Sequence, residues 1–294
     1  MKLHRLLIFL TIASSFLMIT ACGGGGGGSI EYGEVAMHIT DTKPLLPEGA
    51  KNVTNLWITF TGVLVHKSGG GWISLPLTGD PPHIIDLLQF IDGNTTKIVP
   101  PALLEYGKYT QIRLLIDSAI IRFNNDPDTD SPVVIPPEHL KTDKNFIFDV
   151  DKPAAVDIII DLDLSQSLVV TDPFGTPSYK LNPVLHIVRA SEAATINGEI
   201  NQGSFIVGND AKVTVYVPNS DSQGGYEEYT KIEVAESGTD PTKFSIYWLV
   251  PDQDYRVEIE FDSDFGNGIE FSEDVNRDDL QSGDIWNLNR DTPI

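Results

Sequence analysis

Acidic side chains alternate over one short segment of the chain. Asp126, Asp128 and Asp130 stand at every second position of NNDPDTD, residues 124–130. Calcium is bound by several oxygen ligands, and a single loop can supply them. We therefore predict a candidate calcium site at these three residues, with a solvated turn rich in Asp, Asn and Pro as the alternative. The segment departs from the EF-hand pattern, because Ser131 stands where that pattern has glycine.

A second pair of carboxylates has a spacing suited to acid–base chemistry. Asp161 and Asp163 lie two residues apart in an alternating segment, which places them on one strand face about 6.5 to 7 Å apart. This is near the separation of the two carboxyls in inverting glycosidases. However, a general acid needs a pKa raised by burial, and the alternation places both residues on the solvent-facing side. We therefore expect no catalysis by this pair.

The motifs of common enzymes are absent from the sequence. It contains no G-x-S-x-G, no Walker A loop and no H-E-x-x-H. We predict no catalytic residues. A hydrolase whose carboxylates come from distant segments is the alternative.

Aromatic residues offer a candidate binding surface. Trp72 follows a glycine-rich turn, and Tyr226 and Tyr229 lie in a second glycine-rich region. Exposed rings of this kind can stack on sugars, whereas Trp57 and Trp248 stand in alternating segments and are expected in the core. We predict ligand contacts at Trp72, Tyr226 and Tyr229.

Apolar residues of the chain recur with period two, which predicts half-buried strands. Leu56, Ile58 and Phe60 share a face, and residues 157–164 place aliphatic side chains on one side and aspartates on the other. Similar alternation occupies residues 109–116, 212–217, 244–249 and 256–261. We predict an all-β protein of two antiparallel β-sandwich domains, with a short helix or helical turn at 82–90.

The first 21 residues have the features of a signal peptide. Lys2 and Arg5 precede an apolar or small stretch, Leu6–Ile19, which is shorter than the roughly 20 residues that span a bilayer. Residues 19–22, ITAC, then resemble the bacterial lipobox. The resemblance implies cleavage before Cys22 and diacylation of its thiol, which would hold the protein to a membrane.

Six glycines follow this cysteine, and residues 22–32 are predicted to be a flexible tether. Gly23 directly after Cys22 resembles the pattern of lipoproteins sorted to an outer membrane. The run also matches G-x-G-x-x-G, but a dinucleotide site is rejected because a signal peptide, and not a strand, precedes it.

The chain is acidic, with 20 Lys plus Arg against 42 Asp plus Glu and a formal net charge of −22. Nucleic-acid binding needs clustered basic residues, so nucleic acid is excluded as a partner. We expect the membrane, through the lipid, and envelope proteins or glycans as partners.

We predict a domain at 33–190 and a second at 195–294, separated by small polar residues. The first resembles, in the order and spacing of several blocks, the bacterial lipoprotein family called domain of unknown function 4382. The blocks are WITFTGVLVHKSGGGWISL (57–75), IIDLLQFIDG (84–93), LLEYGKYTQIRLLID (103–117), VDIIIDLDLSQSLV (156–169) and YKLNPVLHIV (179–188). The resemblance implies an exported β-sandwich and supplies no catalytic residues.

Residues 195–290 resemble the carboxypeptidase-regulatory or transthyretin-like module. The matching features are the strand INGEI (196–200), the strand AKVTVY (211–216) and a turn at 250–257 that lacks the usual glycine. Such modules are usually non-catalytic. We therefore predict a lipid-anchored, non-catalytic binding or assembly module of the cell envelope, with calcium-assisted carbohydrate binding as the alternative within binding proteins.

Overall fold

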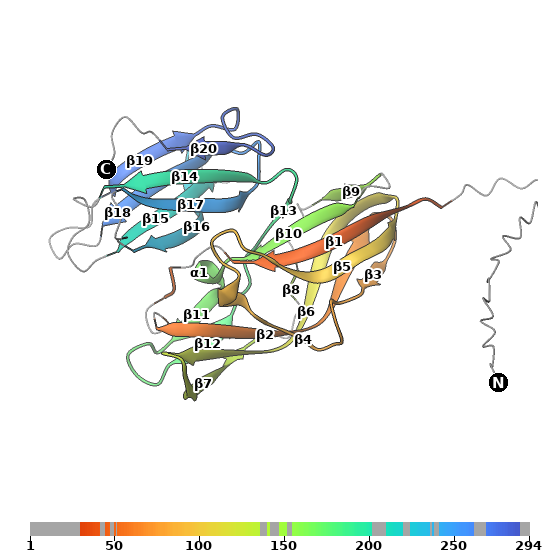
Figure 1. Ribbon diagram of the computed structural model, residues 1–294, viewed down its shortest axis with the longest axis horizontal. Helices are drawn as coiled ribbons and strands as arrows, with labels where there is room; N and C mark the ends of the chain where they lie inside the picture. The colour runs from red at the N-terminus through yellow and green to blue at the C-terminus, as the bar shows by residue number, and fades with distance from the viewer. Residues whose placement is uncertain are drawn as a thin grey trace, which may run out of the picture. The chain divides into compact units, whose positions relative to one another are not determined.

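Strand pairing among the described residues forms four sheets (Figure 1). The computed structural model describes residues 30–41, 45–47, 50, 52–135, 140–141, 147–151, 155–201, 210–219, 224–235, 237, 241–261 and 269–288. The predicted signal peptide, Cys22 and residues 23–29 of the predicted tether lie outside the described residues, whereas Tyr32, the last residue of that predicted tether, lies in a strand.

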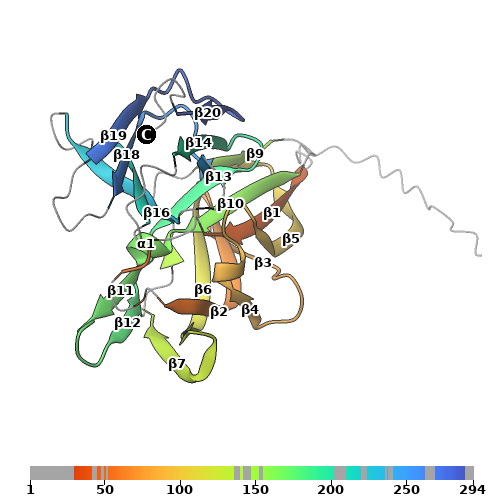
Figure 2. The same ribbon diagram turned by 60° about the vertical axis from the view of Figure 1, so that its left-hand side comes forward.

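Two sheets are built from the first two thirds of the chain. The β1 sheet has the order β13-β10-β1-β5, from β1 (Tyr32–Thr40), β5 (Thr96–Glu105), β10 (Val156–Leu162) and β13 (Leu185–Arg189). The nine strands of the β6 sheet are β2 (Val53–Lys67), β3 (Trp72–Leu75), β4 (His83–Asp86), β6 (Gly107–Phe123), β7 (Asp126–Val134), β8 (Leu140–Lys141), β9 (Phe148–Val150), β11 (Leu168–Thr171) and β12 (Ser178–Leu181). Figure 2 shows β1, β5 and β10 lying across β2 and β6.

The remaining strands form two smaller sheets. The β14 sheet has the order β17-β14-β20, from β14 (Ala194–Ile200), β17 (Thr242–Leu249) and β20 (Ile285–Asn287). The β15 sheet has the order β16-β15-β18-β19, from β15 (Ala211–Pro218), β16 (Tyr226–Val234), β18 (Tyr255–Phe261) and β19 (Ile269–Val275).

Period-two alternation produces the core of the first pair of sheets. Leu56, Ile58 and Phe60 on β2 are all buried, as the sequence predicts, and they belong to one hydrophobic cluster drawn from the β1 and β6 sheets. Tyr109 stacks on Phe148 at 5.0 Å between ring centres, and its hydroxyl donates to the carbonyl of Glu105 at 2.8 Å. The buried ring thus retains a partner for its polar end.

The β14 and β15 sheets share a second hydrophobic cluster. Gly198 on β14 lies under the ring of Phe244 on β17, and a Cβ added there would lie 2.1 Å from the Phe244 Cζ. Tyr255 is buried and its hydroxyl donates to the carbonyl of Val250 at 2.8 Å. Residues 31–294 form one compact unit, and the division into domains near residues 191–195 stays a prediction.

The all-β prediction is confirmed, and the structure adds details of strand direction and helical segments. Three strand pairs run parallel, β1 with β10, β7 with β12 and β14 with β20, although antiparallel sheets were predicted. Within the segment 82–90, predicted as a short helix or a helical turn, Leu87–Gln89 form a single 3₁₀ turn, η1, and the residues before it form β4. The only α-helix in the described chain is α1 (Leu164–Ser167). No helix among the described residues is both long enough and apolar enough to cross a membrane.

Candidate functional site: a buried acidic cluster and an exposed apolar face

Three buried carboxylates meet where β1 and β10 end. Asp41 directly follows β1, Asp161 lies on β10, and Asp163 precedes α1; none is more than 4% exposed. They meet because β1 and β10 pair in parallel, with Thr40 opposite Asp161. We call these three residues the acidic cluster.

The predicted exposure of Asp161 and Asp163 is therefore wrong. Alternation along β10 is interrupted at this end, where every residue from Ile158 to Leu162 is buried. The strand lies between β1 and β13 in its sheet, and side chains from α1, β13 and β16 pack over its end. The face of β10 that the sequence predicts to face solvent is therefore buried by these neighbouring elements.

Asp163 is held in its charged form by the groups around it. Its carboxylate accepts hydrogen bonds from the Ser165 hydroxyl at 2.5 Å and from the Gln166 backbone and side-chain N–H groups at 3.2 and 2.9 Å. The His186 Nε2 lies 3.6 Å from the carboxylate. Burial alone would raise the pKa of Asp163, but the contacts with His186, Ser165 and Gln166 outweigh it and lower the pKa. Asp163 therefore caps α1 as a carboxylate.

Asp41 has the opposite electrostatic behaviour. One carboxyl oxygen accepts the Leu164 N–H at 3.2 Å, and the other is buried without a hydrogen-bond partner. Burial, followed by the nearby charges of Asp161 and Asp163, raises the pKa of Asp41 well above its usual range. The surroundings thus favour its protonated form.

Residues of β16 cover the acidic cluster. The Gln166 side chain donates to the Tyr229 carbonyl at 2.5 Å, and the His186 ring stacks on Tyr229 at 4.0 Å. Tyr229 was predicted to contact a ligand from a loop; instead it lies on β16, and its hydroxyl is fully buried. Burial raises the pKa of Tyr229 well above its usual range. The contacts of Tyr229 are those of a packing residue.

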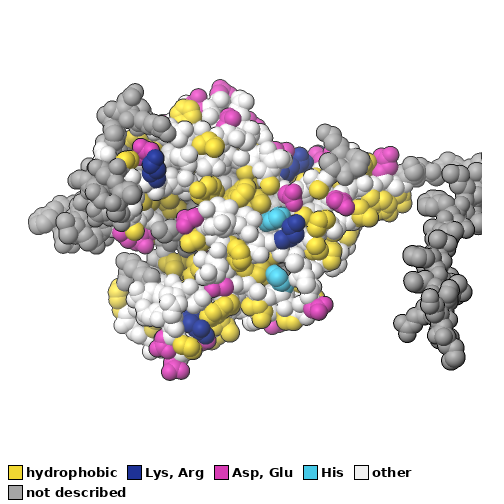
Figure 3. Space-filling model, in the orientation of Figure 1, with side chains coloured by type: hydrophobic (Ala, Val, Ile, Leu, Met, Phe, Trp, Pro, Cys, Tyr) yellow, Lys and Arg dark blue, Asp and Glu magenta, His cyan; other side chains and the backbone are white. Residues whose placement is uncertain are grey.

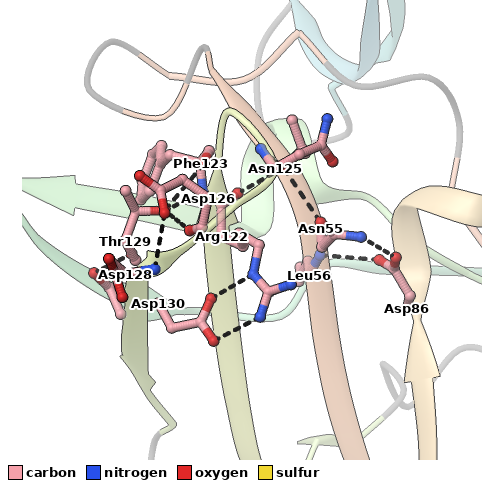
Figure 4. A network of polar contacts seen from close by, with 12 residues as sticks. Asn55, Leu56, Asp86, Arg122, Phe123, Asn125, Asp126, Asp128, Thr129 and Asp130 are labelled. Carbon is pink, nitrogen blue, oxygen red and sulfur yellow. Dashed lines mark hydrogen bonds and ion pairs between the residues drawn. The ribbon is translucent and has the colours of Figure 1, made fainter.

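The predicted calcium ligands lie at the β6–β7 hairpin but do not converge (Figure 4). Asp130 makes a two-point ion pair with Arg122, at 2.7 and 2.9 Å, and this contact lowers the pKa of Asp130. Asp126 accepts the backbone N–H of Asp128 at 3.0 Å, which closes the turn. Within the described ranges, no three His, Cys, Asp or Glu side chains are placed to hold a metal ion. Calcium binding here stays a prediction, and it would require Asp130 to leave Arg122.

The other predicted ligand-binding aromatics are each covered by an arginine. The Arg113 guanidinium lies 4.1 Å from the centre of the Trp72 ring, and His66 contacts the same ring edge-on at 5.2 Å. Arg256 lies 4.0 Å from the centre of the Tyr226 ring. One face of each ring is therefore already occupied by a cation.

An exposed set of apolar side chains lies on the side of the β6 sheet away from its core. Ile84 on β4 and Val134 on β7 are each 60% exposed, and Ile120 on β6 is 41% exposed. Ile120 is paired across strands with Trp57 on one side and Pro132 on the other. Directly paired residues share a sheet face, so Trp57, Ile120 and Pro132 are neighbours. Ile84, paired with Thr59, and Val134, two residues after Pro132, point to the same face. We call Trp57, Ile84, Ile120, Pro132 and Val134 the apolar face.

Polar side chains on the strands of this face are fixed by hydrogen bonds, which Figure 4 shows. Asp86 accepts the Asn55 side-chain N–H at 2.6 Å and the Leu56 backbone N–H at 3.0 Å. Arg122, paired with Asp130, also lies 4.5 Å from the centre of the Trp57 ring. Binding surfaces commonly combine an apolar centre with a polar rim.

One small hollow lies elsewhere, on the β14 sheet. Its volume is about 170 Å³, and its polar lining includes Asn197, Ser245 and Asn287. Ligand sites are usually clefts of about 300 Å³ or more. The acidic cluster and the predicted binding residues do not line it.

Residues 32–183 match the family described as Domain of unknown function (DUF4382). The chain belongs to this family. The DUF4382 match covers the acidic cluster and the apolar face, whereas Tyr226 and Tyr229 lie beyond it. The resemblance of residues 195–290 to a transthyretin-like module stays a prediction.

Comparisons of this DUF4382 protein with curated proteins and solved structures do not indicate a function. No curated protein matches it significantly. Solved structures that match include a leucine-rich repeat protein from Bacteroides thetaiotaomicron VPI-5482, at 10% identity and a TM-score of 0.22, over 90% of this chain and 26% of that one. The fimbrial anchor protein Mfa2 from Porphyromonas gingivalis matches at 10% identity and a TM-score of 0.19, over 77% of each chain. The truncated tip fimbrial protein Mfa3 from the same organism matches at 12% identity and a TM-score of 0.15, over 83% of this chain and 81% of that one. TM-scores this low support no inference about fold or function.

The apolar face of the DUF4382 domain was missed in the sequence, although a signal was present. Ile120 and Ile121 are adjacent, as are Pro132, Val133 and Val134. In a strand, adjacent residues point to opposite faces, so consecutive apolar residues place one on each side of the sheet. Asp41 and His186 had no such signal, because they join the acidic cluster only through long-range contacts.

Proposed function

We propose that this protein is a lipid-anchored, non-catalytic module that binds another protein of the cell envelope through the apolar face. The observation that carries the proposal is the grouping of Ile84, Ile120 and Val134, all well exposed, on one side of a single sheet. Contiguous exposed apolar patches on soluble proteins mark interaction sites.

The burial of the acidic cluster supports a non-catalytic role. A general acid or base must come within hydrogen-bond reach of its substrate. Asp41 and Asp163 are each 1% exposed, and the hydrogen bonds of Asp163 are made by its own helix and its neighbours. The contacts of the acidic cluster are explained by stabilisation of the fold, and no substrate is needed to explain them.

The covering of the aromatic rings favours a protein over a carbohydrate as ligand. Sugars stack on open ring faces, but Arg122 covers one face of Trp57, and Trp72 and Tyr226 carry arginines in the same way. The exposed atoms of the apolar face belong mainly to aliphatic side chains, which pack against other apolar side chains.

The proposed anchor is Cys22, and the proposed site of anchoring is the outer membrane. The arguments for both are the lipobox-like residues 19–22 and Gly23, which stand in the sequence alone. The acidic net charge of −22 favours solubility of the part outside the membrane.

Site-specific photocrosslinking in cells of the native host tests the proposed binding. A photoreactive phenylalanine analogue at Val134 is expected to give a covalent adduct with one protein, and the Ile120→Lys substitution should abolish that adduct. The same analogue at Asp157, an exposed residue of β10, is the control and should give no such adduct. Failure to form an Ile120-dependent adduct at Val134 would refute binding through this face, whereas an adduct with a second copy of this chain would identify the partner as itself.

A further inference from the structure

A second exposed apolar patch lies on the outer side of β1 and its partner β5. Leu103 is 67% exposed and Tyr32 is 47% exposed, and Pro101 is also exposed. Tyr32 pairs with Glu105 and Glu34 pairs with Leu103, so Tyr32 and Leu103 share one face two residues apart. Figure 3 shows hydrophobic side chains gathered where β1 begins in Figure 1. We call Tyr32, Pro101 and Leu103 the β1–β5 patch.

The short length of chain between this patch and the proposed lipid on Cys22 limits the distance between the patch and the membrane. Tyr32 is ten positions after Cys22 in the sequence. A fully extended chain spans at most about 3.5 Å per residue, so Tyr32 lies within about 35 Å of an acylated Cys22. This limit holds for any conformation of the intervening residues. The start of β1 is therefore the part of the folded body that is closest, along the chain, to the membrane.

We infer that the β1–β5 patch rests on the headgroup region of a zwitterionic phospholipid bilayer. The inference rests on the proposed acylation of Cys22. Tyrosine is enriched at membrane interfaces, where its ring meets the apolar boundary and its hydroxyl remains in the polar layer. Leu103 and Pro101 supply apolar surface beside it without a hydrogen-bonding side chain.

The charges around the patch determine which lipids fit. Glu34 is exposed beside Leu103, and the charge of Glu105 is neutralised by Lys67 at 2.7 Å. Anionic headgroups would be repelled by Glu34 and by the acidic chain as a whole. A zwitterionic surface, which has cationic amines at its outer level, accommodates a glutamate better.

Contact through so few side chains is too weak for the free protein to remain on a bilayer. A tether of about ten residues, however, raises the effective concentration of the patch at the surface to the millimolar range. We therefore expect docking only when the protein is attached to the membrane through residue 22.

Tryptophan quenching by brominated lipid tests the inference. The chain from Cys22 to Ile294, made without the signal peptide, is coupled through its single thiol to a maleimide lipid in brominated phosphatidylcholine vesicles. The Leu103→Trp variant should fluoresce more than the unsubstituted chain because of its added tryptophan. Brominated lipid should reduce this additional fluorescence by at least half. Ile84→Trp, at a site of similar exposure on β4, is the matched control and should not be quenched.

The experiments test the docking of the β1–β5 patch and the acylation of Cys22 independently of each other. Equal quenching at residues 103 and 84 would overturn the inference, as would stronger quenching when anionic phosphatidylglycerol replaces phosphatidylcholine. Acylation of Cys22 is measured separately, by mass spectrometry of the protein purified from host membranes. If Cys22 is unmodified there, the proposed anchor fails, while quenching in the maleimide-coupled sample still decides the docking.

Discussion

Replacing Asp41 by asparagine is expected to change how the stability of the protein depends on pH. Asparagine keeps the shape of the side chain and an oxygen that can accept the Leu164 N–H, but it cannot ionise. In the unsubstituted protein, burial and the neighbouring aspartates hold the pKa of Asp41 well above its usual value near 3.8.

The sign of the effect follows from proton binding. Because the pKa of Asp41 is higher in the folded state, the folded protein binds more protons than the unfolded protein between the two pKa values. The stabilising contribution of Asp41 is thus complete below its unfolded pKa and is lost as pH rises through its folded pKa. Each pH unit of this window lowers the free energy of unfolding by about 1.4 kcal/mol.

Urea unfolding at pH 4, 6 and 8, followed by tryptophan fluorescence, measures this difference. Relative to the unsubstituted protein, Asp41→Asn should gain stability between pH 4 and pH 8, by about 1 kcal/mol or more in the free energy of unfolding. Asp117→Asn, at an exposed position on β6, serves as the control and should show no such gain. A difference between Asp41→Asn and the unsubstituted protein that does not change with pH would refute the argument.

Three further predictions concern Asp163, Gly198 and Cys22. Asp163→Asn should lower the free energy of unfolding by about 1–3 kcal/mol at pH 7 and by less as pH falls through the lowered pKa of Asp163, which urea titrations at several pH values would reveal. Gly198→Ala should lower the free energy of unfolding by about 1–3 kcal/mol, because its Cβ would meet the Phe244 ring, whereas Gly71→Ala, with open space around it, should change it by less than about 0.5 kcal/mol. Cys22→Ser should move the protein from the membrane to the soluble fraction of host cells; retention in salt-washed membranes would contradict lipid anchoring.

The sequence predicted burial correctly where the alternation within a single strand determines which side chains face the core. The apolar alternation of Leu56, Ile58 and Phe60 placed all three in the core, because one face of β2 meets the opposing sheet. The same reasoning failed for Asp161 and Asp163, because alternation along a strand does not reveal what covers its other face. That cover includes Tyr229, which is more than 60 residues away in the sequence.

Candidate sites were harder to predict than strands, because they depend on contacts between segments that are distant in the sequence or lie on different strands. Asp126, Asp128 and Asp130 have a spacing that suits calcium, but the sequence did not show that Arg122, across the hairpin, would bind Asp130. Trp57 was expected in the core as part of an alternating strand. It lies on the apolar face under Arg122, because the opposite side of β2 is the one that meets the core.

The yield of crosslinked adduct at Val134, measured in two variant backgrounds, tests most directly whether the apolar face carries the function. Our account predicts that Ile120→Lys abolishes the adduct, while Asp41→Asn, which changes only the buried cluster, leaves the yield unchanged. Loss of the adduct in Asp41→Asn together with an unchanged yield in Ile120→Lys would contradict the account.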